Sequence, residues 1–456
     1  MNTSLSIQFL GGAGTVTGSK YLIQSGKRRI LVDCGLFQGI KELRLKNRKP
    51  LPVDPADIHA VILTHAHLDH TGYLPLLVKR GFRGKVYCTQ PTAELTQVIL
   101  MDSAKLQEMD AEYANRKGFS KHHPALPLYT QEDAERAIHF LTPMPPHQWH
   151  KIFNDISFQF KSSGHILGSA FIELEIQGKR IVFSGDLGRQ KPFLLNPPES
   201  IERADYLLIE STYGDRLHNP ESPSKELARV IHDVISRKGH LLIASFAVGR
   251  AQDLLFLISQ LKRENKIPDI PVYVDSPMAK NALDIFHRYS KWHALSPTEC
   301  AEICNAAHVV NSREESKHLL ELEQSSIVIS ASGMLSGGRV LFHLENRLSE
   351  EKNTILLVGF QAAGTRGRLL RSGARELKMH GRYIPVKAHI EEITTLSAHA
   401  DQSEIITWLR GFKSPPKMTF IIHGEPQASD ALRLHVQDEL GWSSCVPNPM
   451  DEVKLD

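Results

Sequence analysis

The stretch that decides the fold is HAHLDH, residues 65–70, which directly follows the apolar run AVIL at 60–63. Alternate side chains of an extended segment point the same way, so His65 and His67 can meet one metal ion. Asp69 and His70 follow after the chain has turned, and they can address a second ion close by. A lone HxH pair is more often a pair of ordinary surface or core histidines. Four ligand side chains within six residues behind a buried strand favour a metal site.

Further ligand candidates recur in matching surroundings, each after an apolar or extended run and beside glycine. They are Asp33 in VDCG, His165 in SSGHILGS, Asp186 in VFSGDLG and His423 in IIHGE. Glycine beside a ligand allows the sharp turns that loops at strand ends require. Each residue alone is more often a turn residue. Together with HAHLDH they supply nitrogen and oxygen ligands and no cysteine, which suits a dinuclear zinc site in a hydrolase.

This set resembles motifs one to four of the metallo-β-lactamase superfamily. The segments IESTYG (209–214), LSAHAD (396–401) and IIHGE (421–425) resemble motifs A, B and C of its β-CASP branch, whose members cut nucleic acids. The resemblance is strongest to the cleavage-and-polyadenylation endonuclease type and its prokaryotic homologues. It is looser to ribonuclease J, because the additional C-terminal domain typical of that group is missing.

The resemblance implies an α/β protein, in which a metallo-β-lactamase αββα sandwich carries an inserted doubly wound α/β domain, the β-CASP domain. The expected limits are 1–213 for the first part of the sandwich, 214–390 for the insertion and 391–456 for the C-terminal return. The residue pattern agrees, because the runs LLIASFA, PVYVDSP, SSIVISAS and TILLVGF do not alternate with polar residues. Such strands are typical of a parallel sheet covered on both faces.

Local patterns predict the elements that carry some of these residues. Two strands, ISFQFKSSGH and AFIELEIQGKRIVFSGD, deliver His165 and Asp186. Residues 92–118 have helical spacing. A helix begins at Asp401 with Glu404 three residues on, a capping-box pattern that fixes the loop before it.

The resemblance also implies a role for each ligand. One zinc ion is expected on His65, His67 and His165, and the second on Asp69, His70 and His423, with Asp186 bridging the two. Mn²⁺ could substitute, because this ligand set is not sharply selective. Asp33 is expected to orient a ligand imidazole and raise its basicity.

The expected catalytic residues are Asp69, Glu210 and His399. Two zinc ions lower the pKa of water to about 7, which supplies a nucleophile without a side-chain base. The leaving O3′ needs a proton, and His399 is the expected donor, with Glu210 orienting it. The products are then a 3′-hydroxyl and a 5′-phosphate. Glu210 considered alone is equally well a strand-end carboxylate.

A basic segment, TRGRLLRSGARELK at 365–378, is a candidate for phosphate contact. It places five cations against one acid, and Arg366 and Arg368 are the candidate RNA ligands. Clustered cations neutralise phosphates. The competing interpretation is a solvated helix face.

Other candidate RNA contacts lie before this segment and in motif B. Ser332, Gly333 and Ser336 in SASGMLSGGR (330–339) can form a phosphate nest, although a structural turn explains the pattern nearly as well. Arg250 can meet phosphate at a strand-to-helix turn or serve in a salt bridge inside the insertion. Ser397 of LSAHAD completes the candidate set.

Composition sets broader limits. The chain of 456 residues has a net charge of +3, which is too small to indicate nucleic-acid binding by itself. No secretory signal is visible, and the longest apolar runs fall short of the roughly 20 residues that span a bilayer. Five scattered cysteines suit reduced thiols in a cytoplasm. Cytoplasmic localisation without a membrane partner is therefore expected.

The predicted function is zinc-dependent hydrolysis of single-stranded RNA in RNA processing or decay, by internal cleavage. The alternatives are a 5′-exoribonuclease of the ribonuclease J kind, a hydrolase of a small ester or thioester, and a catalytically inactive scaffold. The insertion and motifs A to C argue against a small substrate, and intact ligands argue against a scaffold. DNA-directed members usually have valine at motif C, so His423 favours RNA. A homodimer is compatible with the family, but the sequence does not specify the oligomeric state.

Overall fold

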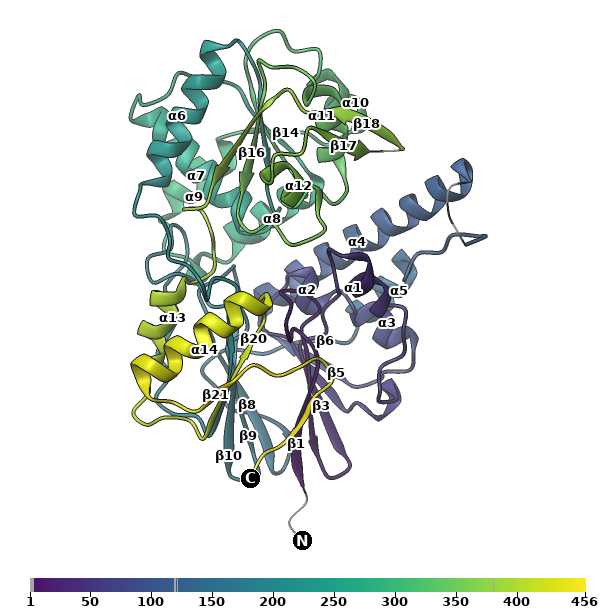
Figure 1. The fold of residues 1–456 in the computed structure, drawn as a ribbon, viewed down its shortest axis with the longest axis vertical. Coiled ribbons are helices and arrows are strands. Elements are labelled where there is room, and N and C mark those ends of the chain that lie inside the picture. The colour runs from purple at the N-terminus through teal and green to yellow at the C-terminus, as the bar shows by residue number, and fades with distance from the viewer. Residues whose placement is uncertain (1–3, 119, 121, 380) are drawn as a thin grey trace. The chain divides into compact units, whose positions relative to one another are not determined.

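The computed structural model describes residues 4–118, 120, 122–379 and 381–456 (Figure 1). Contacts divide the chain into two compact units. The sandwich unit comprises the chain up to Leu217 together with His399–Asp456, and the inserted unit is His218–Ala398. These contact boundaries lie C-terminal to the expected domain limits after 213 and 390, which remain predictions.

Two seven-stranded sheets form the sandwich unit. The first has the order β22 (Glu452–Lys454), β1 (Leu5–Gly11), β2 (Lys20–Ser25), β3 (Arg28–Val32), β4 (Ala60–Ile62), β5 (Lys85–Cys88) and β6 (Leu141–Pro143). The second has the order β21 (Ser444–Cys445), β20 (Met418–Ile422), β11 (Tyr206–Glu210), β10 (Lys179–Phe183), β9 (Ala170–Ile176), β8 (Ile156–Ser162) and β7 (His150–Phe153). Both sheets therefore contain strands from the N-terminal part and from the C-terminal return.

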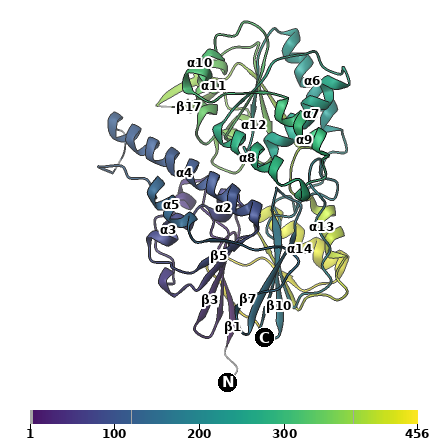
Figure 2. The ribbon, with the colours of Figure 1, turned by 180° about the vertical axis from the view of Figure 1, so that it is seen from behind.

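Apolar side chains from both sheets meet in one core, where the rings of Phe9 and Phe420 lie 5.2 Å apart between centroids. The helices α2 (Leu68–Thr71), α3 (Leu74–Lys79), α4 (Gln90–Lys117) and α5 (Gln131–Ile138) contribute side chains to a second core with the first sheet. The helices α13 (Gln402–Leu409) and α14 (Pro426–Leu440) do the same for the second sheet. Figure 2 shows these helix layers on opposite sides of the paired sheets, so the expected αββα order is confirmed.

Most local expectations for the sandwich unit hold. The helix expected over 92–118 is α4, and α13 begins with the expected capping box, in which Asp401 and Glu404 cap each other's backbone amides. One expectation is wrong: AFIELEIQGKRIVFSGD is not one strand but the hairpin of β9 and β10. Gln177 and Gly178 both have positive φ at its turn, which matches the right-handed twist of a tight hairpin.

The inserted unit has a six-stranded parallel sheet, as its unalternating apolar runs predict. Its order is β14 (His308–Val309), β13 (Val272–Asp275), β15 (Ile327–Ser330), β12 (Leu241–Ala244), β16 (Thr354–Val358) and β19 (His389–Ile393). The helices α6 (Pro223–Ser236), α7 (Arg250–Arg263), α8 (Pro277–Arg288), α9 (Pro297–Asn305), α10 (Arg313–His318), α11 (Arg339–Arg347) and α12 (Arg366–Arg371) connect the strands. A separate hairpin joins β17 (Glu376–Met379) to β18 (Arg382–Pro385). Among the described residues, no helix combines the length and apolar character needed to cross a membrane.

Candidate metal centre

The ligand candidates lie where strands of both sheets end. His65 and His67 follow β4, and the short helix α2 carries Asp69 and His70. The remaining candidates follow β3, β8, β10, β11 and β20, and they are Asp33, His165, Asp186, Glu210 at the end of its strand, and His423. This common edge brings together side chains that are up to 390 positions apart in the sequence.

A first group of four atoms surrounds one point. His67 Nδ1 lies 3.2 Å from Nε2 of His65 and 3.2 Å from Nε2 of His165. Oδ2 of Asp186 lies 3.3 Å from the His65 nitrogen and 3.4 Å from the His165 nitrogen. A tetrahedron with edges of this length has its centre about 2.0–2.1 Å from each corner, the distance at which zinc binds imidazole nitrogen. The group therefore fits a four-coordinate zinc ion.

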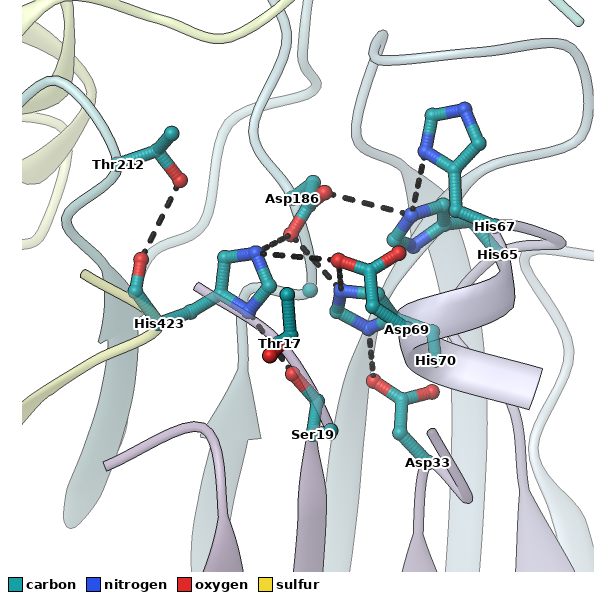
Figure 3. A network of polar contacts seen from close by, with 12 residues as sticks. Thr17, Ser19, Asp33, His65, His67, Asp69, His70, Asp186, Thr212 and His423 are labelled. Atoms are coloured by element: carbon teal, nitrogen blue, oxygen red, sulfur yellow. Dashed lines mark hydrogen bonds and ion pairs between the residues drawn. The ribbon is translucent and has the colours of Figure 1, made fainter. Parts of the chain in front are cut away.

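A second group is built on the other oxygen of the same carboxylate. Oδ1 of Asp186 lies 3.2 Å from Nε2 of His70 and 3.4 Å from Nε2 of His423. Oδ2 of Asp69 is more distant, at 3.9 Å from the His70 nitrogen and 3.8 Å from the His423 nitrogen. This wider group leaves more room for an additional ligand, as a catalytic site requires. Figure 3 shows Asp186 between the two sets of imidazoles.

The neutral state of the three imidazoles favours metal binding in the first group. Burial, together with the charge of His70, lowers the pKa of His65 to about 4, and burial lowers the pKa of His67 to about 3. Burial and the charge of His399 hold the pKa of His165 well below its ordinary value. Neutral imidazoles are the form that binds metal, so these three side chains are ready ligands near pH 7.

The second group contains two buried polar atoms without a hydrogen bond in the described residues. Nε2 of His70 and Oδ1 of Asp186 are buried and lie 3.2 Å apart, and within the part of the chain that the structure describes neither atom meets the geometry of a hydrogen bond. Burial by itself lowers the pKa of His70, but the charges of Asp186 and Asp33 outweigh it and raise that pKa well above its ordinary value. Buried polar atoms without partners are rare in proteins, and a cation between them would satisfy both.

Further side chains orient the ligand rings. Nδ1 of His70 lies 2.7 Å from Oδ2 of Asp33, as expected for a carboxylate that fixes a metal-binding histidine. Thr64 donates its hydroxyl to Asp33 at 2.9 Å and also lies 3.0 Å from Nδ1 of His65. Ser19 Oγ lies 2.8 Å from Nδ1 of His423 (Figure 3). The sequence patterns did not single out Ser19 or Thr64.

Two residues of this network have unusual backbone conformations. Asp33 has a φ of 57° and His423 a φ of 49°, both in the left-handed region that residues with a Cβ rarely adopt. Such conformations persist only where surrounding contacts hold them, and they cluster at functional sites. The backbone amide of Asp33 donates to Ile62, and that of His423 donates to Gly12 at 2.6 Å.

His399 and Glu210 form a titratable pair beside the first metal group. His399 Nδ1 is 3.0 Å and 3.1 Å from the two carboxylate oxygens of Glu210, and its Nε2 is 4.0 Å from Oδ2 of Asp186. Burial lowers the pKa of His399, but the charge and hydrogen bond of Glu210 outweigh it and raise that pKa to about 9. Glu210 also accepts from the backbone amide of Leu187 at 2.6 Å. An imidazole held protonated beside a metal group can donate a proton.

The candidate RNA contacts of the inserted unit lie at the carboxyl ends of three adjacent strands. Arg250 follows β12, the loop with Ser332, Gly333 and Ser336 follows β15, and Arg366 with Arg368 follows β16. Ligands of open α/β sheets commonly bind at this edge. Arg250 is buried and pairs with Asp253 at 2.9 Å, the salt bridge named as its alternative role.

The competing interpretation of 365–378 as one helix face does not hold, because α12 ends at Arg371 and a strand, β17, begins at Glu376. Arg366 donates from Nη1 to the carbonyls of Leu335 and Ser336 at 3.2 Å and 3.3 Å, so it holds the loop after β15. Ser332 Oγ accepts from the amide of Ser336 at 3.2 Å. Ser397 is buried, and its amide donates to Thr394.

Comparison with known protein families gives three matches. Residues 13–231 match the metallo-beta-lactamase superfamily, residues 251–370 match the Beta-Casp domain, and residues 383–447 match the Zn-dependent metallo-hydrolase RNA specificity domain. The matches cover segments of both units and include every ligand candidate.

Curated relatives match over nearly the whole chain. Ribonuclease TTHA0252 of Thermus thermophilus is 35% identical over 433 residues, 92% of this chain and 94% of that protein. An RNase J-like protein of Methanocaldococcus jannaschii is 31% identical, with 97% of each chain covered. Transcription termination factor FttA of the same organism is also 31% identical, over 99% of this chain and 72% of its own length.

A solved structure of a protein of unknown function from Enterococcus faecalis has a similar fold, with a TM-score of 0.54. It is 14% identical, and the match covers 99% of this chain and 100% of that one. At this identity the likeness concerns the fold alone.

Proposed function

Because this chain belongs to the β-CASP branch of the metallo-β-lactamase superfamily, we propose that it hydrolyses phosphodiester bonds of single-stranded RNA with two zinc ions. The observation that carries the proposal is the position of Asp186. Its Oδ1 faces the group of His70 and His423, and its Oδ2 faces the group of His65 and His165. A carboxylate shared in this way is the arrangement expected for two neighbouring cations.

The first ion is assigned to four ligands and the second to four, with Asp186 common to both. The first set is His65, His67, His165 and Asp186, and the second is Asp69, His70, His423 and Asp186. When bound, ions of this kind polarise phosphoryl oxygens and lower the pKa of water to about 7. Mn²⁺ is an acceptable substitute for such ligands.

The remaining chemistry belongs to side chains of the chain itself. His399, held protonated by Glu210, donates a proton to the leaving O3′ oxygen, which is a poor leaving group as an alkoxide. Asp33 and Ser19 keep the rings of His70 and His423 in fixed orientations. The scissile bond is then the one between phosphorus and O3′, so the products carry a 3′-hydroxyl and a 5′-phosphate.

RNA is the proposed substrate for two reasons. Two relatives that match over more than nine-tenths of both chains are named as a ribonuclease and as an RNase J-like protein, and residues 383–447 match a domain described by its RNA specificity. The inserted unit also places Arg250, Arg366 and Arg368 after the carboxyl ends of two adjacent strands of its sheet. A hydrolase of a small ester has no use for that edge.

The test is incubation of the purified protein with internally labelled and 5′-end-labelled RNA and with matching DNA, with and without chelator. We expect chelator-sensitive internal cleavage of RNA. Release of mononucleotides from the 5′ end would instead identify the exonucleolytic mode of ribonuclease J. Hydrolysis of a thioester with intact RNA in every lane would contradict the proposal.

A further inference from the structure

The hairpin of β17 and β18 in the inserted unit has one buried and one open face. Leu377 and Met379 on β17 are buried, 1% and 0% exposed, so they anchor the hairpin to the core of the unit. The register places Lys378 directly opposite Tyr383. Because successive side chains of a strand alternate between faces, these two residues share the face away from the anchor.

Tyr383 is one of the most exposed large apolar side chains of the described chain, at 60%. The Nζ of Lys378 lies 5.5 Å from the centre of its ring, so a cation sits beside the aromatic surface without covering it. An exposed aromatic ring flanked by a cation is the element on which proteins stack unpaired bases.

The surroundings of the ring are positively charged. The hairpin and its base carry four exposed cations, which are Arg375, Lys378, Arg382 and Lys387. They carry one exposed acid, Glu376. Within the described part of the chain, none of these four pairs with a carboxylate. The register places Arg382 opposite Met379, on the anchored side, so Lys378 is the strand cation that shares the open face with Tyr383. A cation without a carboxylate partner on an exposed face is complementary to a phosphate.

The hairpin is also fixed in place. Arg366 donates from Nε to the carbonyl of Lys378 at 3.2 Å, and its Nη1 donates to Leu335 in the loop after β15. One guanidinium therefore connects the hairpin to the carboxyl edge of the parallel sheet. A surface held this way loses little conformational entropy on binding.

We propose that this hairpin is a docking surface for single-stranded RNA, in which a base stacks on Tyr383 and a phosphate contacts Lys378. The inference deepens the proposed function and rests on it for the kind of nucleic acid. Single strands are the fitting partner because their bases are free to stack, whereas the bases of a duplex are already stacked on each other. A protein partner would need a larger apolar surface than one ring.

The stacking is tested with a matched pair of substitutions. Tyr383→Phe keeps the ring, and Tyr383→Leu keeps an apolar side chain but removes the ring. In the metal-loaded protein carrying His399→Ala to prevent cleavage, we expect Tyr383→Leu to weaken binding of an unstructured RNA by about fivefold or more. Tyr383→Phe should remain within about twofold of the parent. Equal melting temperatures of the two variants would show that the hairpin is intact.

The charge is tested separately. Lys378→Ala should reduce the slope of log affinity against log salt by about 0.7, the value for one phosphate contact. The matched control, Lys317→Ala, removes one exposed cation elsewhere in the inserted unit and should leave the slope unchanged. RNA carrying 5-iodouridine should crosslink to Tyr383 on irradiation.

Three results would overturn the inference: parent-like binding by Tyr383→Leu, an equal loss for duplex and single-stranded RNA, or crosslinks only outside the hairpin. These outcomes are distinguishable from failure of the proposed function. If the wild type cuts RNA while Tyr383→Leu binds it normally, the hairpin inference alone fails. If the wild type binds RNA through Tyr383 and never cuts it, the proposed hydrolysis alone fails.

Discussion

The Nδ1 atom of His399 lies 3.0 Å and 3.1 Å from the two carboxylate oxygens of Glu210, which is completely buried. The two residues are 189 positions apart, and the inserted unit lies between them in the sequence. Their pairing places a protonated imidazole 4.0 Å from the carboxylate shared by both metal groups.

Replacement of His399 by alanine should separate proton donation from metal binding. We expect His399→Ala to keep its metal ions and its affinity for RNA and to lose roughly 10²–10⁴ in the rate of cleavage, the usual contribution of a general acid. Single-turnover kinetics and elemental analysis measure the two effects. Loss of zinc from this variant would show that His399 is a ligand, and the roles of His399 and His423 would need to be exchanged.

The raised pKa of His399 predicts a pH dependence of stability in the metal-free protein. Its pKa is about 9 in the folded chain and about 6.5 in an unfolded one. The protonated imidazole therefore stabilises the fold fully below pH 6.5, and this contribution is lost as the pH rises through 9.

Glu210→Gln should remove most of that contribution. Chemical denaturation between pH 6 and 10 should show that wild type exceeds the variant in unfolding free energy at low pH, with the difference narrowing above about 9. NMR titration of the His399 ring provides an independent measurement, and an unchanged pKa in the variant would refute the pairing.

The metal content of the protein tests whether Asp186 is shared by two ions. The wild type should hold close to two zinc ions per chain after dialysis, and Asp186→Ala should lose both, because each group contains one of its oxygens. His165→Ala is the matched comparison, since it touches only the first group and should spare the second ion. Fewer than one transition-metal ion per wild-type chain would refute the dinuclear assignment.

Ser19 offers a sharper test of the second group. Ser19→Ala removes the partner of Nδ1 of His423 without touching a ligand atom. Loss of an outer partner typically costs 10- to 100-fold in metal affinity, so we expect about that loss for one ion only. Competition with a chelator measures it, and equal weakening of both ions would indicate a general structural effect.

The two arginines of α12 should differ in what they contribute. Replacing Arg366 and Arg368 together should flatten the salt dependence of RNA binding by about one to two units of slope. Arg368→Ala alone should give only the charge effect, whereas Arg366→Ala should also lower the melting temperature, because it holds the loop after β15 and the hairpin. Binding equal to the parent at every salt concentration would make this segment an ordinary solvated surface.

The family resemblance predicted the sandwich, and residue patterns predicted the inserted parallel sheet and the residues that meet at the strand ends. The predictions from residue patterns worked because unalternating apolar strands and glycine-flanked ligand candidates are local patterns. The hairpin of β9 and β10 was missed, although Gln177 and Gly178 are a turn signal between two strand patterns. The break within the basic segment was not predicted, because charge spacing alone does not show that α12 ends at Arg371 and that Leu377 is buried in a core.

Partners of the ligands were harder to predict than the ligands. Ser19 and Thr64 are residue types found in any loop, and only the three-dimensional approach of distant strands shows that they contact His423 and Asp33. Arg366 was selected for its charge, yet its guanidinium binds backbone carbonyls of a loop 30 residues away in sequence. Such contacts depend on tertiary structure that a single sequence does not encode locally.

The late position of β20 and His423 in the sequence has a consequence for synthesis of the chain. Domains fold as they leave the ribosome, N-terminal parts first. Asp186 is the last residue of the first metal group in the sequence. The second group lacks a ligand until His423 has emerged, after the whole inserted unit. The nascent chain thus carries an incomplete metal centre while it is still beside its own messenger RNA, and the centre is completed only after the inserted unit has been synthesised.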